Sequence, residues 1–136
     1  MSGILSIATS GLQAATRRLE VSASTIANAD SAGPMPPADP ATVANNPSPS
    51  VPEHANTVET ADGGSPAVLT AVSPSDIATS DPTARHADSK ETVAVPTVDF
   101  ATQAARRLQA RDVFAANAQV IRTCSQVMKS LLDINI

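Results

Sequence analysis

Few residues of this chain are of a type that could catalyse a reaction or bind a metal ion. The two histidines, His54 and His86, have no nearby cysteine and no closely spaced carboxylates with which to form a metal site. Cys124 is the single cysteine, so no disulfide can form within the chain, and the sequence defines no base for its thiol. A glycine-rich phosphate loop is also missing from the sequence. We therefore expect no catalytic residues, no metal site and no cofactor.

The charge pattern argues against nucleic acid as a partner. The net charge is -4, and residues 31–96 carry eight acidic residues against two basic ones. Such a chain has no general attraction to phosphate backbones. No run of the sequence approaches the roughly 20 apolar residues of a membrane span, and the start lacks the positive region of a cleaved signal peptide. We expect neither nucleic-acid binding nor a membrane span.

The middle of the chain has the composition of a linker. All eleven prolines lie between Pro34 and Pro96, where Ala, Ser, Thr and Asp are also common. Pieces such as GPMPPADP, NPSPSVP and DGGSP favour an extended chain without a packed core. We predict an acidic, largely disordered linker over residues 31–96. In the alternative, the short apolar runs at residues 67–72 and 92–95 form isolated strands against a partner, because so long a loop is unusual in a compact domain.

The N-terminal segment carries the apolar repeat of a helix, expected over about residues 3–28. Large apolar residues recur every seven positions, at Leu5, Leu12, Leu19 and Ile26. A second row of small residues follows three positions after each, at Ala8, Ala15, Ser22 and Ala29. These are the a and d rows of a coiled-coil seam. Gly11 beside the seam would let a neighbouring helix approach closely.

The C-terminal segment is the stronger helix, expected over about residues 98–133. It contains no glycine and no proline. Its apolar stripe consists of Val113, Phe114, Val120, Ile121, Val127, Met128 and Leu131. Asn117 and Cys124 fall on the same stripe at heptad spacing, and three arginines interrupt its beginning. The stripe therefore predicts a clean packing seam in the second half of this helix.

Both ends of the chain resemble the flagellar rod and hook family. Residues 10–31, SGLQAATRRLEVSASTIANADS, resemble the family's N-terminal signature, in which a small-Gly-apolar start leads through Ala and Arg-Leu to an Ala-Asn close. Residues 98–134 are similar to its C-terminal helix, with Phe114 at the usual Tyr. Asn117, Val120, Ile121, Thr123, Met128 and Leu131 then follow in the expected register. Two signatures in the right order are more specific than either one alone.

The resemblance implies a structural subunit of the bacterial flagellar basal-body rod, most similar to the proximal-rod members, that transmits torque for motility and has no enzymatic step. In that family the two terminal helices pair as an antiparallel coiled coil, and many copies stack helically. The implied partners are other copies of the chain, other flagellar rod proteins and the flagellar type III export apparatus. The implied location is the periplasmic rod of the basal body, reached without a cleaved signal peptide.

We therefore predict a mainly α fold in which long N- and C-terminal helices pair as an antiparallel coiled coil around a Pro-rich, largely disordered middle. The expected segments are residues 1–30, 31–96 and 97–136. The predicted assembly interface consists of Leu5, Leu12, Leu19, Ile26, Val113, Phe114, Asn117, Val120, Ile121, Val127, Met128 and Leu131. Periodicity alone would equally suit a generic coiled-coil adaptor, and another type III export substrate is a further alternative.

Overall fold

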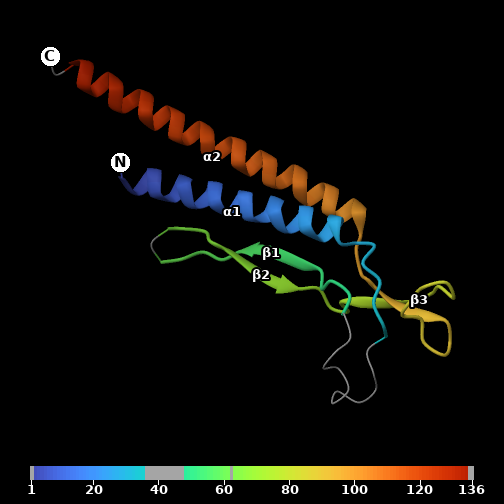
Figure 1. Ribbon diagram of the computed structural model, residues 1–136. Helices are drawn as coiled ribbons and strands as arrows, with labels where there is room; N and C mark the ends of the chain where they lie inside the picture. Colours follow the sequence, from blue (N-terminus) through green and yellow to red (C-terminus); the bar gives the residue numbers. More distant parts are fainter. Residues whose placement is uncertain (1, 36–47, 62, 135–136) are drawn as a thin grey trace.

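The structure, a computed structural model, describes residues 2–35, 48–61 and 63–134. In these residues two long helices form the ends and four short strands lie between them (Figure 1). The elements are α1 (Ser2–Ala27), β1 (Glu53–Thr57), β2 (Ala67–Ala71), β3 (Asp76–Ser80), β4 (Thr92–Pro96) and α2 (Phe100–Ile134). The strands pair antiparallel as two separate hairpins, β1 with β2 and β3 with β4.

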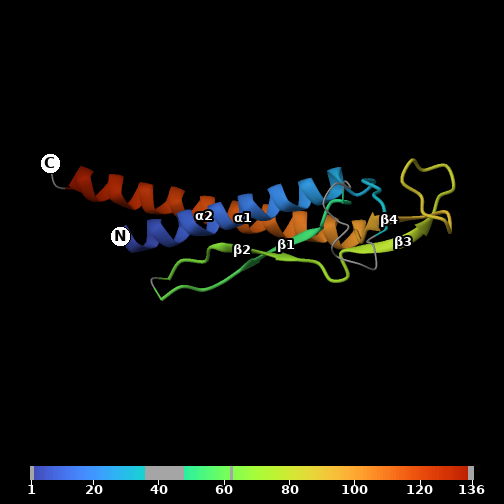
Figure 2. The same cartoon turned by 60° about the horizontal axis from the view of Figure 1, so that its bottom comes forward.

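The two helices run in opposite directions and pack against each other (Figure 1). α1 has 26 residues and α2 has 35, so at about 1.5 Å per residue α2 is roughly 13 Å longer. Figures 1 and 2 show that α2 continues past the start of α1 at its C-terminal end. The sequence-based expectation of a helix at each end, with bounds within two residues of those observed, is confirmed.

α2 begins where it does because Asp99 caps its first turn. The Asp99 carboxylate accepts hydrogen bonds from the backbone N–H of Ala101, at 3.0 Å, and from the hydroxyl of Thr102. The Asp99 carbonyl accepts the first backbone bond of the helix, from the N–H of Gln103 at 3.0 Å. An aspartate in this position satisfies N–H groups that have no partner inside the helix.

The first hairpin joins β1 and β2 in a register that runs from Glu53 opposite Ala71 to Thr57 opposite Ala67. Its loop is closed by hydrogen bonds between Thr60 and Gly64, including the N–H of Thr60 to the Gly64 carbonyl at 2.9 Å. Gly63 sits in this turn with a φ of 78°, a left-handed conformation that glycine adopts without the steric cost of a Cβ. Residues 63–66 of the DGGSP segment are therefore part of a hairpin loop.

The second hairpin lies beyond the end of the helix pair at which α1 stops and α2 starts (Figure 2). Its register runs from Asp76 opposite Pro96 to Ser80 opposite Thr92. On its other edge β4 pairs with the chain that leaves α1, because Gly33 and Ala94 exchange two backbone hydrogen bonds of 2.9 Å each. β4 is thus covered on both edges.

The predicted fold class is wrong, because the middle of the described chain forms two hairpins between the helices. The alternative is right that strands form at residues 67–72 and 92–95, as β2 and β4, but wrong that they are isolated strands against a partner, because each pairs within the chain. Their partner strands come from the same chain and read EHANT and DIATS, which are polar segments without a periodic apolar face. Composition alone could not reveal them. Residues 36–47, which carry part of the expected linker, lie outside the described residues.

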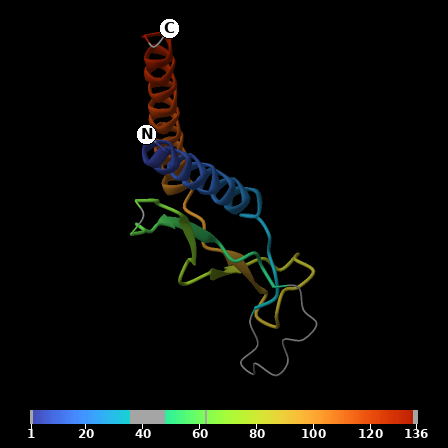
Figure 3. The same ribbon diagram turned by 90° about the vertical axis from the view of Figure 1, so that its left-hand side faces the viewer.

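The buried core is made almost wholly of small residues and follows α1. In Figures 1 and 3, α1 lies between α2 on one side and the β1–β2 hairpin on the other. Buried apolar residues are Ala8, Ala14, Ala15, Val21, Ala29, Val93, Ala94 and Ala110. Three polar residues, Ser22, Thr25 and Gln103, are buried with them. Small side chains bring backbones close together but contribute little apolar area per residue.

We predict that the start of α2 frays in acid because its cap titrates. Hydrogen bonds from the Thr102 hydroxyl and then from the backbone N–H groups of Ala101 and Thr102 hold the pKa of Asp99 below its ordinary value of 3.8. A lowered pKa in the folded state means that the stabilisation is complete above pH 3.8 and is lost as the pH falls through the folded value. The protection factors of the amides of residues 101–103, which correct for the intrinsic pH dependence of exchange, should therefore fall as the pH drops below 3.8.

Two variants separate the cap from general acid unfolding. Asp99→Asn keeps an acceptor oxygen that does not titrate, so its exchange at residues 101–103 should be less sensitive to acid. Asp99→Ala should exchange rapidly at these amides at every pH. Equal acid sensitivity in the wild type and in Asp99→Asn would contradict the role of Asp99.

Candidate assembly interface

The buried face of α1 is centred on its row of small residues and not on its leucines. Ala8, Ala15 and Ser22 are at most 3% exposed, whereas all four residues of the leucine row are only half-buried. The other buried positions, Ala14, Val21 and Thr25, lie on the far side of the small row from the leucines. The leucine row therefore borders the contact with α2 and keeps part of its surface free.

The two helices approach each other closely at Gly11 and Asn117. A Cβ atom at Gly11 would come within 2.6 Å of both Nδ2 and Oδ1 of Asn117, which is too close for a carbon atom that makes no hydrogen bond, so one of the groups would have to move. Asn117 is held in place because its Nδ2 donates to the carbonyl of Val113 at 2.9 Å. Glycine at position 11 therefore leaves the space that the asparagine fills.

Two side chains of α1 hold the β1–β2 hairpin against the helix. The hydroxyl oxygen of Ser10 accepts a hydrogen bond from the backbone N–H of Ser65 at 2.9 Å. The Arg18 guanidinium donates to the hydroxyl of Thr57 at 3.1 Å. The Ser-Gly pair at positions 10 and 11 thus contacts the hairpin with one residue and α2 with the next.

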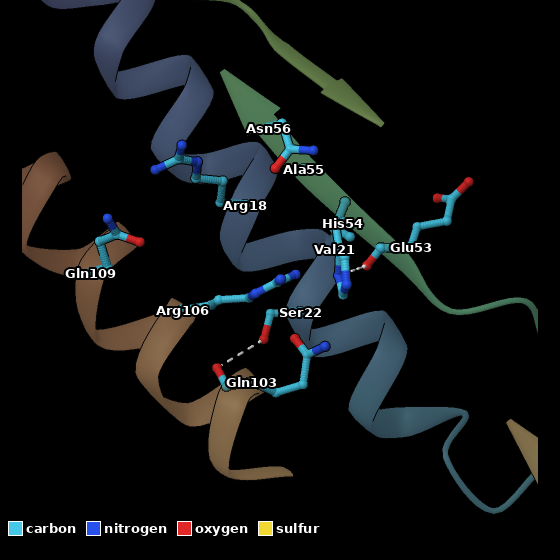
Figure 4. A pocket seen from close by; sticks show the side chains of 10 residues that line it. All are labelled: Arg18, Val21, Ser22, Glu53, His54, Ala55, Asn56, Gln103, Arg106 and Gln109. Carbon is cyan, nitrogen blue, oxygen red and sulfur yellow. Dashed lines mark hydrogen bonds between the residues drawn. The ribbon is translucent and has the colours of Figure 1, made fainter. Parts of the chain in front are cut away.

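A polar cavity of about 190 Å³ lies where α1, β1 and α2 meet (Figure 4). Arg18, Arg106 and His54 line it together with the buried Gln103, and the hydroxyl of Ser22 donates to the Gln103 carbonyl at 3.4 Å. Partial burial, and then the nearby Arg106 guanidinium, lower the pKa of His54. The cavity therefore favours a neutral histidine beside two cationic side chains.

The cavity does not have the arrangement of a metal site. Over residues 2–35, 48–61 and 63–134, no three His, Cys, Asp or Glu side chains come together in a group that could hold a metal ion. In the same part of the chain, neither helix is long and apolar enough to cross a membrane. The features with the clearest capacity for function are therefore the surfaces of the helices.

Burial fades along α2 from its beginning to its end. On one heptad row, Gln103 and Ala110 are buried, Asn117 and Cys124 are half-buried, and Leu131 is 53% exposed. The helices are close where α1 ends and separate toward the C-terminal end of α2 (Figures 1 and 3). The clean apolar seam expected in the second half of α2 is thus an open surface within one chain.

An apolar depression of about 470 Å³ lies along the helix pair on a side that no strand residue lines. Leu19 contributes from α1, and Ala104, Arg107, Leu108 and Arg111 contribute from α2. A separate cavity beside the hairpin is lined by Gly11, Ala14, Thr57, Ser65 and their neighbours. The hairpin therefore covers one flank of the helix pair and leaves the leucine flank open.

The structure places the twelve predicted interface residues along the two helices without gathering them into one seam. Within one chain, Val113 and Asn117 line the same cavity as Gly11. Those half-buried are Leu5, Leu12, Leu19, Ile26, Val113, Asn117, Ile121 and Met128, and those exposed are Phe114, Val120, Val127 and Leu131. As an interface between subunits this set remains a prediction.

Sequence reasoning missed the residues that join the hairpin to the helices. Ser10, Arg18, Thr57 and Ser65 make the two connecting hydrogen bonds, and His54 belongs to the three-element cavity. The available signal was the glycine pair in DGGSP, which marks a turn between two strand-length segments. That signal carries no information about which helix face the hairpin covers.

Together, the long helices with open apolar flanks define a protein built to pack against other helices. A comparison with protein families agrees with this class. A family model described as flagella basal body rod protein matches residues 5–34, which span nearly all of α1 and the turn after it. No curated protein matches the chain. The family match supports a structural role in the flagellar basal-body rod, in a family whose members are not enzymes.

The contact at Gly11 predicts an unusual pair of mutational effects. Gly11→Ala should destabilise the folded chain by about 1–3 kcal/mol, the typical cost of overpacking, because the new Cβ meets Asn117. In an Asn117→Ala background the same substitution should stabilise by up to about 1 kcal/mol, the difference in helix propensity between alanine and glycine. Chemical denaturation followed by circular dichroism measures both changes.

The sign of the effect is the decisive observation. Gly3→Ala is the matched control, because a Cβ at Gly3 meets nothing within 4 Å in the same helix. A stabilising Gly11→Ala substitution in the wild-type background would show that the helices do not pack as described.

Proposed function

We propose that this chain is a structural subunit of the bacterial flagellar basal-body rod. The observation that carries the proposal is the family match at residues 5–34, which falls on α1, the helix at the centre of the fold. The resemblance of residues 98–134 to the same family's C-terminal helix supports it independently. Both segments form long helices that pack against each other, as an axial building block requires.

Within the rod we propose a position in the proximal part. The support is the amino-acid sequence of the N-terminal signature, because its last five residues, ANADS, most resemble those of the proximal-rod protein FlgC. In the structure this ending forms the turn that closes α1, in which the Asn28 side chain donates to the Ser24 carbonyl at 2.9 Å. A subunit in this position would transmit torque along the shaft by packing against its neighbours.

The assembly surface that we propose combines the half-buried leucine row of α1 with the exposed stripe of α2. Large apolar side chains remain in contact with solvent on α2, among them Phe114, Val120, Val127 and Leu131, each more than 40% exposed. Large apolar side chains left exposed on a helix are a feature of surfaces that associate with other proteins. Other copies of the chain and other rod proteins are the partners that we propose for it.

The same proposal includes delivery by the flagellar export apparatus to the periplasmic part of the basal body. Its support is the family resemblance of the two chain ends. A domain poor in large buried side chains, in which Val93 is the largest that is fully buried, is also compatible with passage in an unfolded form. No catalytic step belongs to this role.

Deletion of the gene in a flagellated host tests the proposal. Loss of filaments and of motility, restored by the wild-type gene, is the expected result. Normal filaments and normal swimming would refute a rod role. They would favour the adaptor that periodicity alone suggests.

We predict that Leu12→Asp blocks assembly. Leu12 lies in the leucine row and is half-buried within one chain, so a subunit packing on this flank would bury an unpaired charge. An unpaired buried charge costs well over about 1.4 kcal/mol, so incorporation into purified basal bodies should fall at least about tenfold. Quantitative immunoblotting of those basal bodies measures the incorporation.

The adjacent substitution Gln13→Asp is the matched control, because Gln13 is exposed on the same helix. It should incorporate like the wild type. Circular dichroism on both purified variants would check that they remain helical. Incorporation of Leu12→Asp at the normal copy number would argue against the leucine row as an assembly surface.

A further inference from the structure

We propose that the C-terminal end of α2 in one copy of this chain docks into the depression between α1 and α2 of a second copy. The docking segment is residues 131–134, and the acceptor is the depression lined by Leu19, Ala104, Arg107, Leu108 and Arg111. The inference rests on the proposed function and names the contact through which successive subunits meet.

The acceptor offers an apolar floor with two cationic side chains. Leu108 is 60% exposed there, although it lies beside Leu19 of α1. Arg107 and Arg111 lie four residues apart on α2, which places them on one face of the helix. The ion pair found in the described part of the chain joins Arg17 to Glu20, so neither arginine is held in an ion pair by another described residue.

The docking segment is the part of α2 that extends beyond α1. Leu131, Leu132 and Ile134 are 53%, 70% and 78% exposed, the last two being the most exposed large apolar residues of the described chain. Asp133 stands between them and is exposed as well. The docking segment therefore presents three apolar side chains and one carboxylate to a partner surface.

The charges of the two surfaces are complementary. The last carbonyl groups of a helix have no partner within it, and the C-terminal end carries a partial negative charge. Asp133 adds a full negative charge, and no basic residue lies in the last turn of α2. The guanidinium groups of Arg107 and Arg111 would supply donors both to the carboxylate and to these carbonyls.

The two surfaces cannot meet within one chain. Leu108 and Leu132 lie on one continuous helix, and their separation of 24 positions corresponds to roughly 36 Å. The contact must therefore join different copies. Each copy carries one docking end and one acceptor, and we propose that the contact is head-to-tail, so that it repeats into an open row of subunits when its rotation does not close into a ring. A reciprocal contact would stop at a cross-linked dimer and would contradict this arrangement.

Cysteine cross-linking in assembled material tests the contact. The full chain carrying Leu108→Cys, Leu132→Cys and Cys124→Ser would replace the wild-type gene in a flagellated host, and isolated basal bodies would be oxidised. We expect a ladder of disulfide-linked multimers on a denaturing gel. The matched control pairs Leu108→Cys with Glu59→Cys, on the exposed loop after β1, and should give no ladder.

Charge exchange tests the complementarity. Asp133→Arg should reduce the cross-link yield roughly five- to tenfold, because it replaces an attraction by a repulsion. Combining it with Arg107→Asp and Arg111→Asp should restore most of the yield. Glu59→Arg is the matched charge reversal away from both surfaces and should leave the yield unchanged.

The outcomes separate this inference from the proposed function. A chain that is present in basal bodies but gives no ladder between positions 108 and 132, or gives it equally in the control pair, overturns the docking contact and leaves the rod role intact. The same holds if charge exchange fails to restore the yield. A chain that is absent from basal bodies of motile cells overturns the rod role and this inference together.

Discussion

The rest of the structure depends on the close approach of α1 and α2. Gly11 makes room for Asn117, and Ala15 and Ser22 lie buried along the same row. With so little side-chain volume between the backbones, the contact gains dispersion and excludes water but buries modest apolar area. The larger apolar residues are consequently left at the borders of the contact. The small residues between the helices therefore have two effects. They let the helices of one chain pack tightly, and they leave the large apolar residues on the surface.

The helices could be predicted from the sequence, but the way in which they pack could not. The seven-residue repeat of the N-terminal segment predicts α1, and the apolar stripe without glycine or proline in the C-terminal segment predicts α2. Both sets of bounds agree with the structure to within two residues. The same repeat suggested that Leu5, Leu12, Leu19 and Ile26 would occupy the seam. In the structure the small row is the buried one, and the leucine row is only half-buried. The β1–β2 hairpin packs on the side of α1 away from the leucines, so the buried face of α1 is shifted toward the hairpin. The seven-residue repeat identifies which positions carry large apolar residues. In this structure, however, the positions that are buried are those whose small side chains let the two helix backbones come close.

The hairpins were hidden from sequence reasoning for a different reason. β1 and β3 are largely polar strands, so their formation depends on pairing with β2 and β4, contacts between distant residues that composition does not register. Their contribution is to divide the surface of the helix pair. One flank becomes polar, with Arg18, His54 and Arg106 around a cavity, while the opposite flank keeps Leu19 and Leu108 accessible. The predicted interface residues are distributed accordingly.

The pair of backbone bonds between Gly33 and Ala94 has a consequence for how such a chain can change in evolution. These bonds join the segment that follows α1 to β4, which precedes α2. The end of α1 and the start of α2 are thus held together independently of the sequence between Gly33 and Ala94. Insertions or deletions in the surface loops between the two clasped residues need not alter the alignment of the helices. Variants of different total length are therefore expected to keep the same pairing of α1 and α2 while their loops differ on one side.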